Sequence, residues 1–202
     1  MFIRFSALLS AGLLASVAAV PSLAHAQAAA AVRPVSIGIS GGAGMLQGSA
    51  NDGYDLGYVV AGHLQLRPLL SPLGVRLDVG YANNAVSAST RQQLAGSALV
   101  DLTVLSGFAN VVYALPIAAA PVRPYLLGGV GLGRVRGATV ALGTDGGLST
   151  GTATDTRFGF QVGAGIDIPL VGVAGFAEAG YQRFSLQGGS LGQIPIRFGI
   201  RF

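Results

Sequence analysis

The last nine residues of the chain, 194–202, alternate strictly between large apolar side chains and small or charged ones. Because successive side chains of a β-strand point to opposite faces, this alternation predicts a strand with one apolar and one polar face. The polar face carries Arg197 and Arg201. If the apolar face meets lipid, a shift of one residue would turn each arginine outward at about 2–4 kcal/mol near the bilayer midplane. An edge strand of a soluble sandwich would show the same pattern, so the rest of the chain has to decide.

Alternation of the same kind recurs along the chain and predicts eight strands. Polar, proline-containing or glycine-rich segments separate them, as expected for an all-β protein. In the fourth strand the alternation is weaker, with Leu105, Val111 and Tyr113 expected on the outer face, and in the fifth no alternation assigns the faces. The predicted strands are 35–45, 56–67, 75–81, 99–115, 122–135, 157–168, 173–186 and 194–202.

The connections between these strands alternate in kind. Short turns that contain proline follow the second, fourth and sixth strands, whereas more polar and generally longer loops follow the others, the longest at 136–155. This asymmetry is typical of a membrane barrel with its short turns and both termini in the periplasm and its loops outside. The sequence therefore predicts an all-β protein, an eight-stranded antiparallel up-and-down transmembrane β-barrel.

Composition supports a protein whose surface meets something other than water. Charged residues make up 10% of the chain, against about 25% in ordinary soluble domains, and hydrophobic residues make up 51%. The most apolar internal segment, 99–122, is interrupted by Asp101, Asn110 and two prolines, so it does not predict a spanning helix. A closed barrel is then the remaining structure in which every backbone N–H and C=O group can form a hydrogen bond within lipid. The basic residues are scattered arginines, which disfavours nucleic-acid binding.

The N-terminus reads as a secretory signal. Arg4 precedes an apolar stretch, and Ala24-His25-Ala26 forms a cleavage site of the small-x-small kind. Serines and a proline within the stretch favour cleavage over an uncleaved anchoring helix. We expect a signal peptide at 1–26, a short leader at 27–34 and a barrel domain at 35–202. The chain contains no cysteine, so we expect neither disulfides nor thiolate chemistry.

Three runs carry a resemblance to a known family: RPYLLGGVG at 123–131, GFQVGAGID at 159–167 and PIRFGIRF at 195–202. With them, the mature chain resembles outer-membrane β-barrels of the porin-family, opacity and outer-membrane-protein-A-like type over essentially its whole length. These motifs are compositional rather than catalytic, so the resemblance indicates fold and location more than function. It implies an integral protein of the Gram-negative outer membrane without a cofactor. A periplasmic peptidoglycan-binding domain, present in some relatives, is not expected because the chain stops at the barrel.

The resemblance also implies partners. They are outer-membrane lipid and lipopolysaccharide, together with the barrel-assembly machinery and periplasmic chaperones that insert such barrels; the barrel itself is expected to be a monomer. The terminal Phe202, with Phe198 on the same face, resembles the family's assembly signal, so we expect deletion of Phe202 to leave unassembled protein. The sequence does not name an extracellular ligand for the loops.

Charged residues on the predicted polar faces would point into the lumen. An eight-stranded barrel is narrow and isolated buried charges are costly, so a paired plug is favoured over a polar pathway for solutes. Glu178, the chain's only glutamate, is expected to pair with Arg197 or Arg201 on the neighbouring strand. The expected lumen network consists of Arg76, Asp78, Arg157, Asp167, Glu178, Arg197 and Arg201.

Candidate chemistry is sparse. A lipid-modifying hydrolase would need a serine beside an oriented histidine, and His63 is the only histidine after the signal, with Ser106 or Ser185 as conceivable nucleophiles. A hydrogen-bonded, lumen-filling role explains His63 better. We recognise neither a metal-ligand spacing nor a phosphate-binding loop. The sequence therefore favours a non-enzymatic protein with an envelope-structural or loop-mediated surface role; a narrow channel is the alternative, and a lipid-modifying enzyme is third.

Overall fold

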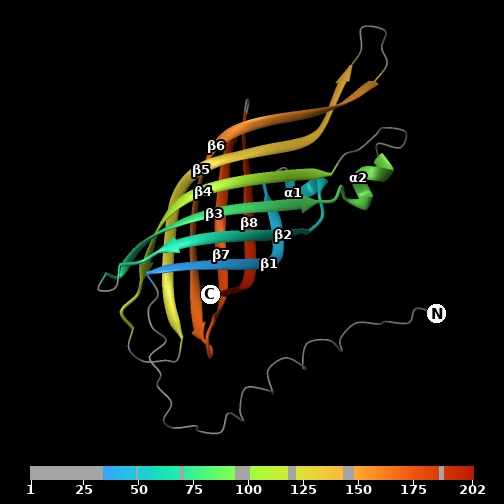
Figure 1. Cartoon of the computed structure of the whole chain (residues 1–202). Helices are drawn as coiled ribbons and strands as arrows, with labels where there is room; N and C mark the ends of the chain where they lie inside the picture. Colours follow the sequence, from blue (N-terminus) through green and yellow to red (C-terminus); the bar gives the residue numbers. More distant parts are fainter. Residues whose placement is uncertain are drawn as a thin grey trace, which may run out of the picture. The chain divides into compact units, whose positions relative to one another are not determined.

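The computed structural model describes residues 34–48, 50–68, 71–93, 101–117, 122–142, 148–186 and 189–202, so the expected signal peptide lies outside the described residues. Eight antiparallel strands form one closed barrel in chain order, which β1 and β8 close (Figure 1). This confirms the predicted up-and-down barrel. The strands are β1 (Val35–Gln47), β2 (Gly57–Leu66), β3 (Leu73–Asn84), β4 (Leu102–Ala114), β5 (Arg123–Leu142), β6 (Leu148–Pro169), β7 (Ala174–Leu186) and β8 (Gly189–Arg201).

The two ends of the barrel differ in their connections. At one end, which we call the turn end, β1 begins, β8 ends, and turns join β2 to β3, β4 to β5 and β6 to β7. The other end, the loop end, carries the short helices α1 (Ala50–Gly53) and α2 (Ala88–Gln93), which follow β1 and β3. Neither helix is long and apolar enough to cross a membrane. Both described helices therefore lie at the loop end.

Two segments predicted as loops are largely strand in the structure. Instead of a loop at 136–155, β5 runs on to Leu142 and β6 begins at Leu148, with the two strands paired throughout. Most of the predicted loop at 187–193 belongs to β8, which begins at Gly189. Both segments are rich in glycine and small polar residues. Backbone pairing forms both strand segments, although their sequences lack the clear apolar alternation that marks the other strands.

The β5–β6 hairpin extends beyond its neighbours at the loop end (Figure 1). β5 pairs with β4 only as far as Arg136, and β6 pairs with β7 only from Gly159 onward. Among the described residues, β6 therefore has no neighbour on its β7 side from Leu148 to Phe158. A strand edge of this kind presents unpaired backbone N–H and C=O groups.

The outer face of the barrel is apolar, as the alternation predicted. Leu105, Val111 and Tyr113 of β4 are exposed on it. The structure also assigns the faces of β5, which the sequence left open, because Tyr125 and Leu127 are buried in the lumen. Its outward apolar side chains include Leu126, Val130 and Leu132.

The inward side chains fill the lumen. The loop half holds an apolar cluster, in which Phe184 is fully buried, and a smaller apolar group surrounds Tyr125. Gly133 and Gly159 make room for Phe184, because a Cβ atom at either position would overlap its ring. A layer of buried polar side chains completes the filling. The apolar cluster comprises Leu46, Val59, Ala82, Leu102, Val104, Phe108, Val135, Phe184 and Leu191.

Replacing Val162 with arginine should test whether the outer face meets lipid. Val162 is 50% exposed in mid-β6, and we expect Val162→Arg to lower the free energy of unfolding by about 2–4 kcal/mol. A matched control is Val171→Arg in the β6–β7 turn, where the valine is fully exposed and a charge should reach water. Denaturant unfolding in lipid vesicles measures both. Equal losses of stability in the two variants would contradict a lipid-facing wall.

Candidate functional site

Glu178 on β7 is the centre of a buried ionic cluster. Its two oxygens accept hydrogen bonds from Arg76, at 2.7 Å from Nη1 and 3.2 Å from Nη2. Arg197, directly opposite Glu178 on β8, forms a second salt bridge to it, and the hydroxyl of Tyr125 donates a hydrogen bond at 2.8 Å. Because β3 and β7 lie half-way around the barrel from each other, the Arg76–Glu178 pair crosses the lumen. The paired charges therefore obstruct the lumen.

A chain of polar groups continues from this cluster around the wall. Arg76 Nε also donates to Asp78 Oδ2 at 3.0 Å, and the amide of Asn110 donates to the same oxygen. Gln161 donates to Asn110 Oδ1 at 2.7 Å, and Gln182 donates to Gln161 at 2.9 Å. All of these groups are at least nine-tenths buried. Buried hydrogen-bond networks of this kind hold their members in one arrangement.

Arg201 organises a second cluster toward the turn end. Its Nη1 donates to both oxygens of Asp167 at 2.8 Å, and its Nε donates to His63 Nε2 at 3.0 Å. The guanidinium also lies 5.1 Å from the ring centroid of Phe176 and 5.8 Å from that of Tyr125. Aromatic faces attract cations at such distances. The side chain of Arg201 is thereby fixed by contacts in three directions.

Six of the seven residues of the expected lumen network are buried in these two clusters. The seventh, Arg157, is partly exposed and pairs with Asp155 on its own strand, away from Glu178. Glu178 pairs with Arg197, while Arg201 pairs with Asp167. Of the two expected assembly residues, Phe202 exchanges backbone hydrogen bonds with Ile37 where β8 closes on β1, and Phe198 points outward.

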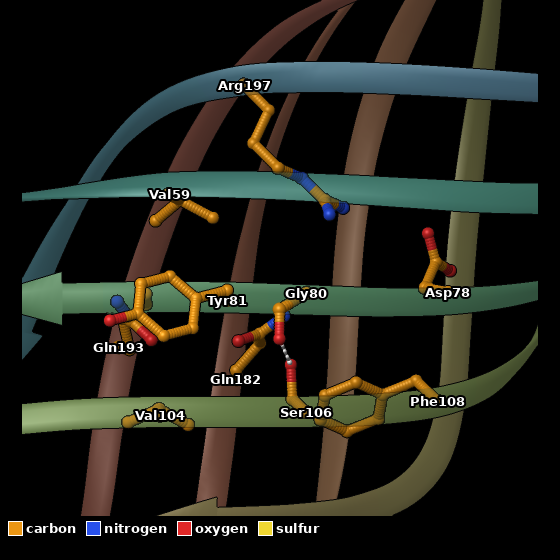
Figure 2. A pocket seen from close by; sticks show the side chains of 11 residues that line it. Val59, Asp78, Gly80, Tyr81, Val104, Ser106, Phe108, Gln182, Gln193 and Arg197 are labelled. Carbon is orange, nitrogen blue, oxygen red and sulfur yellow. Dashed lines mark hydrogen bonds between the residues drawn. The ribbon is translucent and has the colours of Figure 1, made fainter.

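Residues of both the polar layer and the apolar cluster line a small cavity (Figure 2). Asp78 and Gln193 both line it, and both carry a buried atom without a hydrogen-bond partner, Oδ1 and Nε2. An unpaired acceptor and an unpaired donor complement a water molecule, and the cavity is large enough for about one. Other lining residues include Arg197, Gln182, Ser106, Val59, Val104 and Phe108.

The residues considered for catalysis do not come together. His63 is 6% exposed and its Nε2 already accepts a hydrogen bond from Arg201. Ser106 hydrogen-bonds the carbonyl of Gly80 at 3.4 Å (Figure 2), and Ser185 is exposed. Within the described part of the chain, no group of three acidic, histidine or cysteine side chains could hold a metal ion. The polar layer therefore has the geometry of a structural network.

Comparison with known families identifies the family to which the chain belongs. The family profile "Outer membrane protein beta-barrel domain" matches residues 13–202, nearly the whole chain. The chain belongs to that family. Membership agrees with the apolar outer wall and the closed strand order, so the protein is an outer-membrane β-barrel. A comparison with curated protein sequences finds no match.

Several solved structures of outer-membrane proteins resemble this barrel in fold. Neisserial surface protein A has a TM-score of 0.61 at 17% identity, over 84% of this chain and 96% of that one. A major outer membrane protein from Thermus thermophilus has a TM-score of 0.59 at 14% identity, over 84% and 99%. Ail, the attachment invasion locus protein of Yersinia pestis, has a TM-score of 0.50 at 17% identity, over 83% and 97%. At these identities the likeness concerns the fold.

Several members of the polar network in the lumen were not predicted from the sequence. Tyr125 was missed because the faces of its strand could not be assigned. Asn110, Gln161 and Gln182 are buried in the lumen, and the available signal in the sequence was their place on the predicted polar faces. The cross-lumen contact of Arg76 with Glu178 had no signal in the sequence, since it depends on how side chains from opposite walls meet inside the closed barrel.

Proposed function

We propose that the protein is a non-enzymatic, closed outer-membrane barrel that acts at the cell surface through its loop end. The β5–β6 hairpin carries this proposal, because it extends past both neighbouring strands. The unpaired edge of β6 offers backbone groups that can pair with an extended segment of a partner. Because its lumen is filled by side chains, the barrel would serve as a support that holds the hairpin at the cell surface. Attachment, to which the full name of Ail refers, is one such surface role.

The proposed orientation follows from the same asymmetry. Short turns of bacterial barrels face the periplasm and longer loops face outside, so the turn end and both termini would be periplasmic and the hairpin extracellular. Lipid and lipopolysaccharide would surround the apolar wall. Insertion by the barrel-assembly machinery and an assembly role for Phe202 remain predictions, as does a monomeric state.

A narrow channel is the second candidate, and the small cavity beside the polar layer is the observation that favours it. Buried charges flank that cavity, but the pair of Arg76 and Glu178 crosses the lumen beside it. Planar-bilayer recordings separate the two functions. A closed barrel gives little steady current, whereas large stable channels in wild type would favour transport.

Shortening the hairpin should abolish surface binding without affecting the barrel. Gly137 and Ala153 face each other across β5 and β6, so an Asn-Gly turn that replaces 138–152 joins them without changing the register. We expect cells with the full chain to bind members of a panel of immobilised extracellular-matrix and serum proteins, and cells with the shortened chain to lose that binding. Val171→Ala at the turn end is the control. Equal binding by full-length and shortened chains would count against the hairpin.

Heat modifiability on gels should be unchanged in the shortened chain, since the pairing of β4 with β5 and of β6 with β7 lies outside the deletion. A folded, surface-exposed variant with lost binding separates a surface role from a folding defect. If the full-length protein binds no more of the panel than cells that lack the chain, the surface role is wrong.

A further inference from the structure

The turn end of the lumen carries more positive than negative charge. Three arginines meet there: Arg67, which directly follows β2, Arg123 at the start of β5, and Arg201 near the end of β8. Among the described residues, Asp167 is the carboxylate that faces them, and it lies opposite Arg123 across β5 and β6. Glu178 is already shared by other cations deeper in the lumen. Two of the three positive charges therefore lack a matching side-chain carboxylate.

Arg201 has spare hydrogen-bonding capacity in this cluster. Both oxygens of Asp167 are taken by its Nη1, and His63 accepts from its Nε. Its Nη2 is buried without a partner, and the residue as a whole is 7% exposed. A guanidinium can donate five hydrogen bonds. One buried face of this group thus remains unused.

Arg67 has the more telling geometry. It continues the inward positions of β2 after His63 and Gln65, and its backbone N–H donates to the carbonyl of Pro34 at 2.8 Å. Its Nε and Nη2 are both buried without a partner. These two nitrogens form one edge of the guanidinium, the fork that binds two oxygens of a carboxylate or phosphate at once. This edge therefore donates no hydrogen bond to any described protein group.

The surroundings of Arg67 also favour an added negative charge. Burial lowers the pKa of Arg67 below its usual value; Asp167 opposes this, whereas Arg201 and Arg123 lower the pKa further. Like charges side by side in a partly buried site repel one another, and buried donors without acceptors are costly. An anion between the arginines would relieve both penalties.

We propose that the turn end of the lumen is a binding site for a phosphate group, held by the Nε–Nη2 edge of Arg67 and by Nη2 of Arg201. A tetrahedral phosphate presents oxygens in several directions, so it can meet two guanidinium groups that belong to different strands. Its charge also offsets the surplus of the cluster, and exposed Arg123 attracts it from solution. The site lies at the opposite end from the hairpin and does not depend on the surface role.

Free phosphate and a phospholipid headgroup present the same chemistry to this site. Arg67 is only partly buried and lies next to the membrane boundary at the end of β2, so both sources can reach it. Inorganic phosphate added to the barrel in an uncharged detergent tests the first. Vesicles of phosphatidylglycerol, compared with vesicles of an uncharged glycolipid, test the second.

The experiment measures the thermal unfolding midpoint of the refolded full chain at constant ionic strength, with sodium phosphate against sodium chloride. At a phosphate concentration about 100-fold above Kd, the wild-type midpoint should rise by about 5–10 °C. Arg67→Gln should lose this rise. Arg183→Gln, an exposed arginine on β7 toward the loop end, should keep it. Phosphorus NMR titration gives the affinity directly.

Arg67→Lys provides a second variant in case Arg67→Gln fails to fold, since it keeps the charge but removes the fork. We expect it to bind phosphate at least about tenfold more weakly than wild type. A rise only in phosphatidylglycerol vesicles, lost in either Arg67 variant, would assign the site to a headgroup. No rise from any phosphate source, or equal rises in wild type and the Arg67 variants, would overturn the proposal.

Discussion

Glu178→Gln is expected to lower the free energy of unfolding by about 3–5 kcal/mol, because it removes one member of a buried ionic cluster and leaves its partners uncompensated. Arg76 and Arg197 both pair with this carboxylate, and Tyr125 hydrogen-bonds it. The amide cannot accept from three donors with the same charge-assisted strength. Denaturant unfolding in lipid vesicles measures the loss. Planar-bilayer recordings should show more current through the variant than through wild type.

The matched control is Asp155→Asn, the same change from carboxylate to amide at the rim. Asp155 pairs with Arg157, but its side chain is 46% exposed, and exposed ion pairs contribute only about 0–1 kcal/mol. Unchanged stability in Glu178→Gln, or a loss no larger than that in Asp155→Asn, would show that the cross-lumen pair does not hold the barrel. Large stable channels in wild type would likewise contradict a closed lumen.

The fold could be predicted because lipid imposes a strong rule on one face of every spanning strand. Outside the barrel, side chains such as Val60, Leu77 and Phe198 are exposed, and their alternation with inward residues is visible in the sequence. The rule weakens where the lumen is lined by glycine. In β5, Gly129 and Gly131 alternate with Gly128 and Val130 on the outer face, so period-two alternation is lost.

The part of the β5–β6 hairpin that extends past its neighbouring strands could not be predicted by the same reasoning. Where β5 and β6 leave the barrel, their backbones still pair, from Gly137 opposite Ala153 to Leu142 opposite Leu148. No lipid meets this segment in the proposed orientation, so nothing requires an apolar face. Small polar residues then form a strand whose sequence is typical of a loop. Backbone hydrogen bonding, which composition does not report, decides the structure here.

Contacts across the lumen were the least predictable part of the site. Glu178 and Arg197 are on adjacent strands and directly opposite, so their pairing follows once the register of β7 and β8 is known. Arg76 and Glu178 are on opposite walls, and their meeting depends on barrel width, strand tilt and side-chain length together. A list of inward charges therefore identifies the members of the network but leaves their partners open.

Phe184→Ala is expected to destabilise the barrel by about 3–5 kcal/mol, the usual cost of removing a buried phenylalanine. Phe184 is 0% exposed and lies in the apolar cluster, with its ring 5.7 Å from that of Phe108. The neighbouring Gly133 and Gly159 have no side chains that could move into the space. The barrel wall cannot collapse without breaking its closed hydrogen-bond ladder, so the cavity should persist. Denaturant unfolding in vesicles measures the loss.

Phe160→Ala on the neighbouring strand β6 is the matched control. Its ring faces outward and is 41% exposed, so lipid chains can fill the space that its removal leaves, and the loss should be smaller than for Phe184. The two variants remove the same atoms from opposite faces of one wall. An equal or larger loss in Phe160→Ala would mean that the loop half of the lumen is loosely packed, and that the apolar cluster does not close the barrel above its polar layer.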